Sequence, residues 1–300
     1  MKERQIFPLV RRCRHLAFAT LLAWAFTGAG MLAEEAAKTE GSTGEEQIKI
    51  LVDYKNLKKD QRPHLSEHSY SEPEIAKLER DFASLLASMK TTRGKVAAAG
   101  MFLAGMKYCI PYAYPIWHHT KPDENPDYRY CGMFMHPGLF LRPLREDGRT
   151  YQPWGYPYDA RPVRPHWTVL KNLGDTFGNG FTCSQLIGWT LVNAGINKYG
   201  NDTLYSKWAD DLRSYPGSRE VPLKEGHANL RAGDFLGFTG HISLVIAVDG
   251  DHVLFLSADG GGDAAWPGHG VRWHVFDRAR VDYDHYQYKF LVDMSGVYGD

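Results

Sequence analysis

The chain has little cysteine and no surplus of either charge. It holds four cysteines in 300 residues, and its 35 lysines and arginines are balanced by 35 aspartates and glutamates. This balance argues against a sequence-independent nucleic-acid binder, which normally carries a basic excess. Zinc-finger spacing, a phosphate-binding loop and internal repeats are all missing from the sequence. Hydrophobic residues make up 43% of the chain, which suffices for a packed core and excludes wholesale disorder.

After residues 1–33, the sequence has no apolar run that is long enough for a membrane helix. Residues 1–33 combine several basic residues with the apolar run LAFATLLAWAF and the small-residue stretch TGAGMLA. This order predicts a secretory signal peptide that is cleaved after Ala33 or Ala29. An uncleaved signal anchor is the alternative, because the apolar run could almost span a bilayer. We therefore expect a secreted or periplasmic protein without stable membrane insertion after cleavage.

The rest of the chain divides into a polar segment and one domain. Residues 34–73 have low apolar content and mixed charge, which predicts a tether or a loosely ordered pro-segment. The domain occupies residues 74–300. It opens with an amphipathic helix capped by Ser71, and a second helix follows at about residues 95–108.

Strand patterns appear only in the last third of the chain. Residues 109–170 are rich in Pro, Gly and Tyr without clear periodicity, which predicts long loops, either over a cleft or as a surface insertion. From residue 230 onward the segments DFLGF, HISLVIAV, HVLFLSA, GVRWHVF and YKFLVDM are short, β-branched or aromatic, and separated by Gly and Asp. Helices first and a mostly antiparallel sheet second predict an α+β fold.

Three cysteines remain after removal of the signal peptide, an odd number for an oxidising compartment. Cys109 and Cys131 flank a Pro/Tyr-rich stretch, and their disulfide would contribute roughly 3 kcal/mol in the chain-entropy model. Cys183 is then the unpaired thiol. An unpaired thiol in an exported protein is either reactive or intermolecular.

Cys183 stands at the start of a predicted helix. The sequence TCSQ is a capping box, in which Thr182 and Gln185 satisfy each other's backbone N–H groups. The unpaired N–H groups and the dipole of the first turn favour an anion, so a thiolate should form more easily there than in a free cysteine. The alternative is a buried core cysteine, the commonest fate of a free cysteine.

A nucleophilic cysteine needs a base, and His241 is the best candidate. It opens the apolar strand ISLVIAV, and the turn DGD then reverses the chain. With a three-residue loop Asp259 would lie opposite His241, close enough to orient its imidazole. With a two-residue loop Ala258 would lie there instead. A histidine that merely begins a strand is the simpler alternative.

These segments resemble the NlpC/P60 and CHAP group of papain-like cysteine hydrolases. The resemblance rests on IPYAYP, GFTCSQLIGWTLVNAGI, RAGDFLGF, GHISLVIAV and FLSADGG, in that order, and covers about residues 95–260. The sequence departs from the group's pattern in having Thr182 before the cysteine, Gln185 in place of a glycine, and a long insertion at about residues 113–177.

The resemblance implies a papain-like fold and cleavage of amide bonds, most often in the stem peptides of peptidoglycan, without a cofactor. It assigns Cys183 as the nucleophile, His241 as the base and Asp259 as the orienting third residue. On the substrate side it implies Tyr112 near the thiol, with Ser184 and Gln185 directly after the nucleophile.

Three other interpretations remain open. The histidines could gather into a metal site, and the candidate ligands are His118, His119, His136 and His166. The chain could be a non-catalytic wall-binding or structural domain on the same fold. The same chemistry could also act on protein amides, as in a secreted effector.

Overall fold

The computed structural model describes residues 47–57, 59–112, 136–146, 148–159, 176–196, 209–260, 270–278 and 288–300. The predicted signal peptide, Cys131 and most of the predicted insertion lie outside these residues. The described residues all fall within one structural unit, Glu46–Asp300. No helix among them has the length and apolar character needed to cross a membrane.

Two helices form at the start of the domain, where local signals are strong. Helix α1 covers Glu72–Ser88, and the Glu74 carboxylate accepts a hydrogen bond of 2.7 Å from the Ser71 N–H. Helix α2 covers Thr92–Gly105. It begins three residues earlier than predicted because the Thr91 side chain caps it, accepting from the Gly94 N–H.

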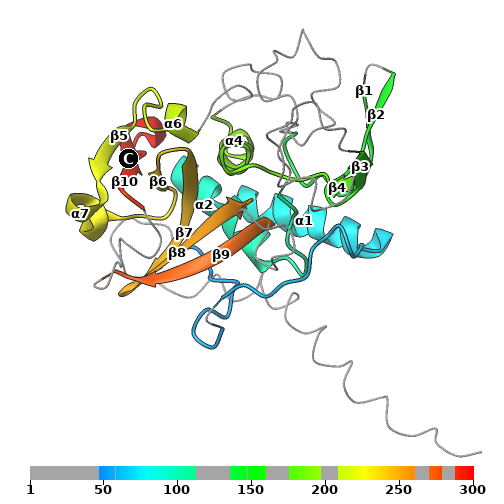
Figure 1. Ribbon diagram of the computed structural model, residues 1–300, viewed down its shortest axis with the longest axis horizontal. Helices are drawn as coiled ribbons and strands as arrows, with labels where there is room; N and C mark the ends of the chain where they lie inside the picture. The colour runs from blue at the N-terminus through cyan, green and yellow to red at the C-terminus, as the bar shows by residue number, and fades with distance from the viewer. Residues whose placement is uncertain are drawn as a thin grey trace, which may run out of the picture. The chain divides into compact units, whose positions relative to one another are not determined.

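The predicted antiparallel sheet is present (Figure 1), and the described residues supply six strands to it. Its strands follow the order β5-β10-β6-β7-β8-β9, and every neighbouring pair is antiparallel. Five of them match the predicted segments, and β5 was not predicted. Their bounds are β5 Arg219–Pro222, β6 Phe235–Phe238, β7 His241–Asp249, β8 His252–Asp259, β9 Gly270–Asp277 and β10 Phe290–Asp293. The chain is therefore α+β, as expected.

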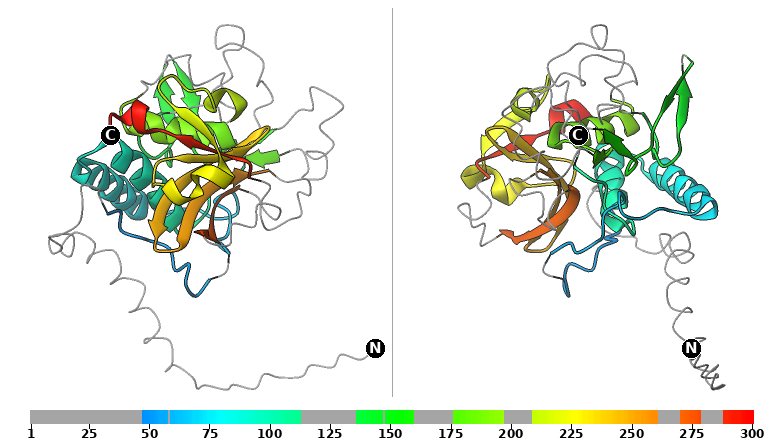
Figure 2. Two further views of the ribbon diagram at one scale, coloured as in Figure 1. Left: turned by 90° about the vertical axis from the view of Figure 1, so that its left-hand side faces the viewer. Right: turned by 45° about the vertical axis from the view of Figure 1, so that its right-hand side comes forward.

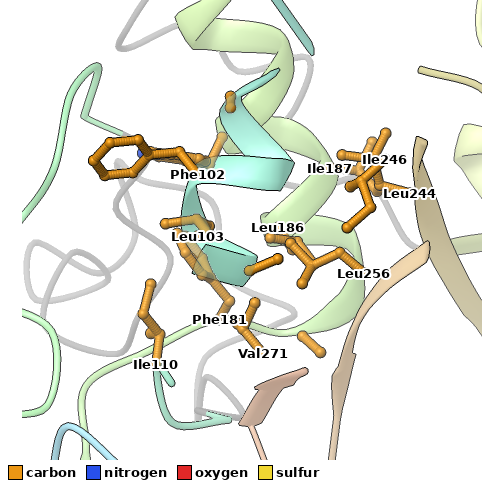
Figure 3. Packing of buried hydrophobic residues seen from close by; sticks show 14 of the residues in the cluster. Phe102, Leu103, Ile110, Phe181, Leu186, Ile187, Leu244, Ile246, Leu256 and Val271 are labelled. Carbon is orange, nitrogen blue, oxygen red and sulfur yellow. The ribbon is translucent and has the colours of Figure 1, made fainter. Parts of the chain in front are cut away.

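Both faces of the central strands are buried. On one face, helix α2 and helix α4 (Cys183–Asn193) pack side by side, with Leu186 and Ile187 directed toward Leu244 and Leu256 (Figure 3). Gly100 lets α2 approach closely, since a Cβ there would lie 2.5 Å from a Leu244 methyl group. The opposite face carries a second apolar cluster, which includes Leu236, Val245, Val253, Phe255, Phe276 and Leu291. Burial on both sides explains why these strands read as continuous apolar runs.

Short strands lie within and just after residues 109–170, the region predicted as long loops (Figure 2). Strands β1 (Leu144–Glu146) and β2 (Arg149–Tyr151) pair antiparallel, as do β3 (Pro157–Asp159) and β4 (Thr176–Gly178). At three residues each, they are too short to leave a periodic signal in the sequence. The remaining short elements are α6 Ala209–Leu212, α7 Leu223–Gly226, the 3-10 helix His227–Asn229 and α8 Ser295–Tyr298.

The described part of the polar N-terminal segment packs against the domain. Tyr54, Asp60 and Leu65 are buried. The Arg62 guanidinium donates to the carbonyls of Met106, just after α2, and Val271, on β9, at 3.2 and 3.1 Å. The segment therefore joins the end of α2 to the edge strand of the sheet.

Candidate functional site

The capping box predicted at the cysteine is present. The Thr182 Oγ1 accepts from the Gln185 N–H at 3.4 Å, and the Gln185 Oε1 accepts from the Thr182 N–H at 2.9 Å. Cys183 is the first residue of α4. Its thiol therefore lies at the end of the helix where backbone N–H groups have no intrahelical partner.

The surroundings of the Cys183 thiol have opposite effects on its pKa. Burial raises the pKa of the thiol, and the backbone N–H groups of Ile242 and Ser184 lower it. Burial dominates, so the pKa lies above its ordinary value. The thiolate was expected to form more easily than in a free cysteine; the helix start has this effect, but the enclosure of the site outweighs it.

Strands β7 and β8 bring His241 and Asp259 together because a turn and a β-bulge jointly set the register of the two strands. Asp249 pairs with His252, so the turn has two residues and not three. A β-bulge between Val245 and Ala247 then shifts the register by one residue. Counting beyond the bulge places His241 opposite Asp259, and the His241 Nε2 lies 3.5 Å from the Asp259 Oδ1.

Ser257 connects the two side chains. Its hydroxyl donates to the Asp259 Oδ1 at 2.6 Å and lies 2.9 Å from the His241 Nε2. Because the single hydroxyl proton goes to the carboxylate, the serine oxygen accepts from His241 Nε2–H. This arrangement leaves Nδ1 as the ring nitrogen of His241 that carries the lone pair.

Two further hydroxyl groups extend the network. The Ser243 Oγ lies 3.2 Å from the His241 Nε2 and 2.7 Å from the Tyr288 hydroxyl. Ser243 and Tyr288 are both buried. Sequence reasoning named neither them nor Ser257, although the alternation of β7 places Ser243 on the same face as His241.

A second histidine, also missed from the sequence, contacts the carboxylate. The His274 Nε2 lies 3.0 Å from the Asp259 Oδ2. The His274 ring stacks on Phe255, with centroids 5.1 Å apart and planes 15° apart. Cross-strand counting from β8 to β9 would not have located it, because Asp259 pairs with Gly270 and His274 pairs with Phe255.

The surroundings lower the pKa values of both Asp259 and His241, for different reasons. Burial raises the pKa of Asp259, but the hydrogen bond and charge of His274 and the charge of His241 outweigh it, so the pKa is lowered. Burial also lowers the pKa of His241. Asp259 raises that pKa and His274 lowers it further, and the net direction is down.

Tyr112 lies between the two halves of the site. Its backbone bridges Phe181, two residues before the cysteine. Its ring packs on Gly260, the residue after Asp259, where a Cβ would lie 2.4 Å from the ring. The structure thus places the predicted substrate-side tyrosine next to both the cysteine helix and strand β8.

Ser184 and Gln185 lie at the expected positions but are turned inward. Both side chains are buried, with 6% and 3% of the residue exposed. The Ser184 Oγ is 3.4 Å from the Thr182 Oγ1, and Gln185 is engaged in the capping box. This burial gives the expected substrate contact of these two side chains no support.

Cys109 is a free, buried thiol, with its Sγ 3.7 Å from the Arg62 carbonyl oxygen. Cys131 lies outside the described residues, so the structure gives the predicted disulfide no support. Burial raises the pKa of the Cys109 thiol to about 11, which makes it a poor nucleophile.

Within the described ranges, no group of three or more His, Cys, Asp or Glu side chains is placed to hold a metal ion. His118, His119 and His166 lie outside those ranges. No protein-family model, curated protein or solved structure matches the chain.

Proposed function

We propose that this chain is an exported cysteine hydrolase of papain-like fold that cleaves amide bonds. Cys183 is the nucleophile, His241 the base and Asp259 the residue that orients the base. The observation that carries the proposal is the position of the Cys183 thiol against the N–H of Ile242, directly after His241. The motif resemblance to the NlpC/P60 and CHAP group supports the same assignment.

The reaction is an acyl transfer through a thioester. The Cys183 thiol gives its proton to His241 Nδ1 while the sulfur attacks the amide carbonyl carbon. The imidazolium then donates this proton to the leaving amine as the C–N bond breaks. Water attacks the thioester, His241 takes a proton from it, and the C–S bond breaks to release the acid and the thiol.

Each neighbouring group has a defined part in this sequence. Asp259 and Ser257 hold Nε2 protonated and stabilise the imidazolium that forms during attack. The backbone N–H groups at the start of α4 face the sulfur and can stabilise the developing oxyanion. Ser184 contributes through its backbone N–H, which hydrogen-bonds to the Cys183 thiol. Its side chain is buried and does not contribute.

The substrate class follows from the resemblance, and peptidoglycan stem peptides are the proposed substrate. The test is a digest of purified peptidoglycan by the full chain, followed by measurement of released amino groups. Wild type should release them, and Cys183→Ser and His241→Ala should not. His252→Ala is the matched control, because His252 lies on the same sheet at its exposed hairpin end and should leave hydrolysis unchanged.

The outcomes separate the candidate substrates. Hydrolysis of an unfolded protein substrate without hydrolysis of peptidoglycan would replace the wall substrate by a protein substrate, as in a secreted effector. Hydrolysis by Cys183→Ser at the wild-type rate would overturn the proposal altogether.

A non-catalytic wall-binding domain is the second candidate, and one observation favours it. Burial raises the pKa of Cys183 and lowers that of His241, so both groups resist charging. If the chain is a binder, wild type and Cys183→Ser should sediment equally well with insoluble peptidoglycan. Neither protein should release amino groups.

A further inference from the structure

Asp259 is shared by two histidines that come from the strands on either side of β8. Its Oδ1 faces His241 and accepts from Ser257, while its Oδ2 lies 3.0 Å from the His274 Nε2. The carboxylate is ionised, so His274 Nε2 donates the hydrogen bond. A charge-assisted hydrogen bond of this kind is about twice as strong as a neutral one.

The ring of His274 is itself held in place. It stacks on Phe255, which belongs to the buried cluster on that face of the sheet. The His274 side chain is 28% exposed, against 15% for His241, so His274 lies on the outer side of the carboxylate. This position brings it into contact with Asp259.

We infer that His274 is a positioning residue that acts on His241 through Asp259. The terminal torsion of an aspartate is broad, so one hydrogen bond to Oδ1 leaves the carboxylate free to rotate. The bond from His274 to Oδ2 fixes the second oxygen. It thereby keeps Oδ1 toward Ser257 and His241, which retains the proton on Nε2 and the lone pair on Nδ1.

This inference rests on the proposed function, but its test does not need the substrate. The rate of Cys183 alkylation by iodoacetamide near neutral pH reports how well His241 removes the thiol proton. His274→Phe keeps a ring on Phe255 without the donor, and His274→Gln keeps an N–H donor without the ring. His252→Ala serves as the matched control.

We expect His274→Phe to slow alkylation about tenfold or more, as for loss of a hydrogen bond to a charged group. His274→Gln should stay within about twofold of wild type. Nitrogen NMR of the His241 ring should show Nε2 protonated in wild type and a mixture of tautomers in His274→Phe. A purely structural role would not produce rescue by glutamine or a change of tautomer.

Two outcomes would overturn the inference, and they differ from failure of the proposed function. If His241→Ala slows alkylation but His274→Phe does not, only the role of His274 is refuted. If His241→Ala also alkylates at the wild-type rate, the thiol–imidazole pair is refuted as well. If His274→Phe does not fold, the wild-type His274 ring decides: a protonated Nε2 supports the inference and an unprotonated Nε2 refutes it.

Discussion

The Cys183 thiol and the His241 imidazole both lie in surroundings that favour their uncharged forms. Burial acts in opposite directions on the two pKa values, upward for the thiol and downward for the imidazole. A resting thiolate–imidazolium pair is therefore disfavoured, and in the proposed reaction the proton would move as the sulfur attacks. Asp259 opposes the effect of burial on His241, because its charge would stabilise the imidazolium during that step.

The two pKa shifts predict a broad pH profile for hydrolysis. The base must be unprotonated, so kcat/KM should rise with pH along an acid limb whose midpoint lies below about 6.5, the ordinary histidine value. The alkaline limb should lie above the ordinary cysteine value, since the proton that reaches the leaving amine comes from the thiol. Initial rates from pH 4 to 11 measure both limbs.

Asp259→Asn tests the direction in which the charge of Asp259 moves the acid limb of that profile. The Asp259 charge raises the pKa of His241, so the amide should move the acid limb to still lower pH. An acid limb above the ordinary histidine value in wild type would show that the charge of Asp259, and not burial, dominates at His241.

Tyr288 carries a prediction about the buried network. Burial raises the pKa of its hydroxyl, which therefore stays protonated, and Ser243 is its partner at 2.7 Å. Tyr288→Phe should lower the free energy of unfolding by about 1 kcal/mol or more, because a buried serine loses a partner. Urea denaturation measures the change, and hydrolysis should fall much less than in His241→Ala. Unchanged stability would contradict the assigned contact.

At the scale of elements, the helices and strands were predictable because each carries a local signal. Capping residues mark the starts of α1 and α4, and β-branched runs bounded by Gly and Asp mark the strands of the sheet. The register of β7 against β8 was not. The stretch Val245–Val248 is apolar at every position, so no alternation of polar and apolar residues reveals the bulge.

The position of Asp259 opposite His241 was thus reached through a wrong turn length. A two-residue turn shifts the register one way, and the bulge shifts it back. The contacts of His274 and Tyr288 depend on how β8, β9 and β10 assemble, which no local pattern encodes. Such long-range neighbours of a site become visible only once the strand order is known.

Gly180 links two elements of the site and predicts a large effect. A Cβ at this position would lie 1.8 Å from the Pro111 carbonyl oxygen, a backbone atom that cannot move alone. Gly180→Ala should therefore push the Pro111–Tyr112 segment away from the start of α4. We expect an unfolding free energy lower by about 2 kcal/mol or more and a loss of hydrolysis.

Gly195→Ala is the comparison for this variant. Gly195 follows the same helix with a φ of 84°, and a Cβ there would meet no atom of the described residues within 4 Å. It should lose about 1–2 kcal/mol through backbone conformation alone, with hydrolysis retained in the folded protein. Hydrolysis by Gly180→Ala at the wild-type rate would contradict the close approach.

At the scale of the whole molecule, the described part of the N-terminal segment packs against the domain, although its low apolar content gave no sign of this packing. Its charged residues Asp60 and Arg62 are largely buried and paired. The Asp60 carboxylate also accepts from the Trp273 N–H at 3.2 Å and lies 3.6 Å from the Arg272 guanidinium. Composition cannot show a pairing between residues more than two hundred positions apart.

Asp60→Ala tests whether this segment holds the sheet in place. The substitution removes the buried carboxylate that pairs with Arg62 and lies 3.6 Å from Arg272, so the free energy of unfolding should fall by about 3–5 kcal/mol. Asp81→Ala is the matched control: its ion pair with Lys77 is exposed on α1, and its loss should change stability by less than about 1 kcal/mol. Urea denaturation compares the two. A removable pro-segment would instead leave the folded domain as stable without Asp60 as with it, and equal unfolding midpoints for wild type and Asp60→Ala would establish that case. Because β9 carries both Arg272 and His274, the same loss should also slow Cys183 alkylation in the molecules that remain folded.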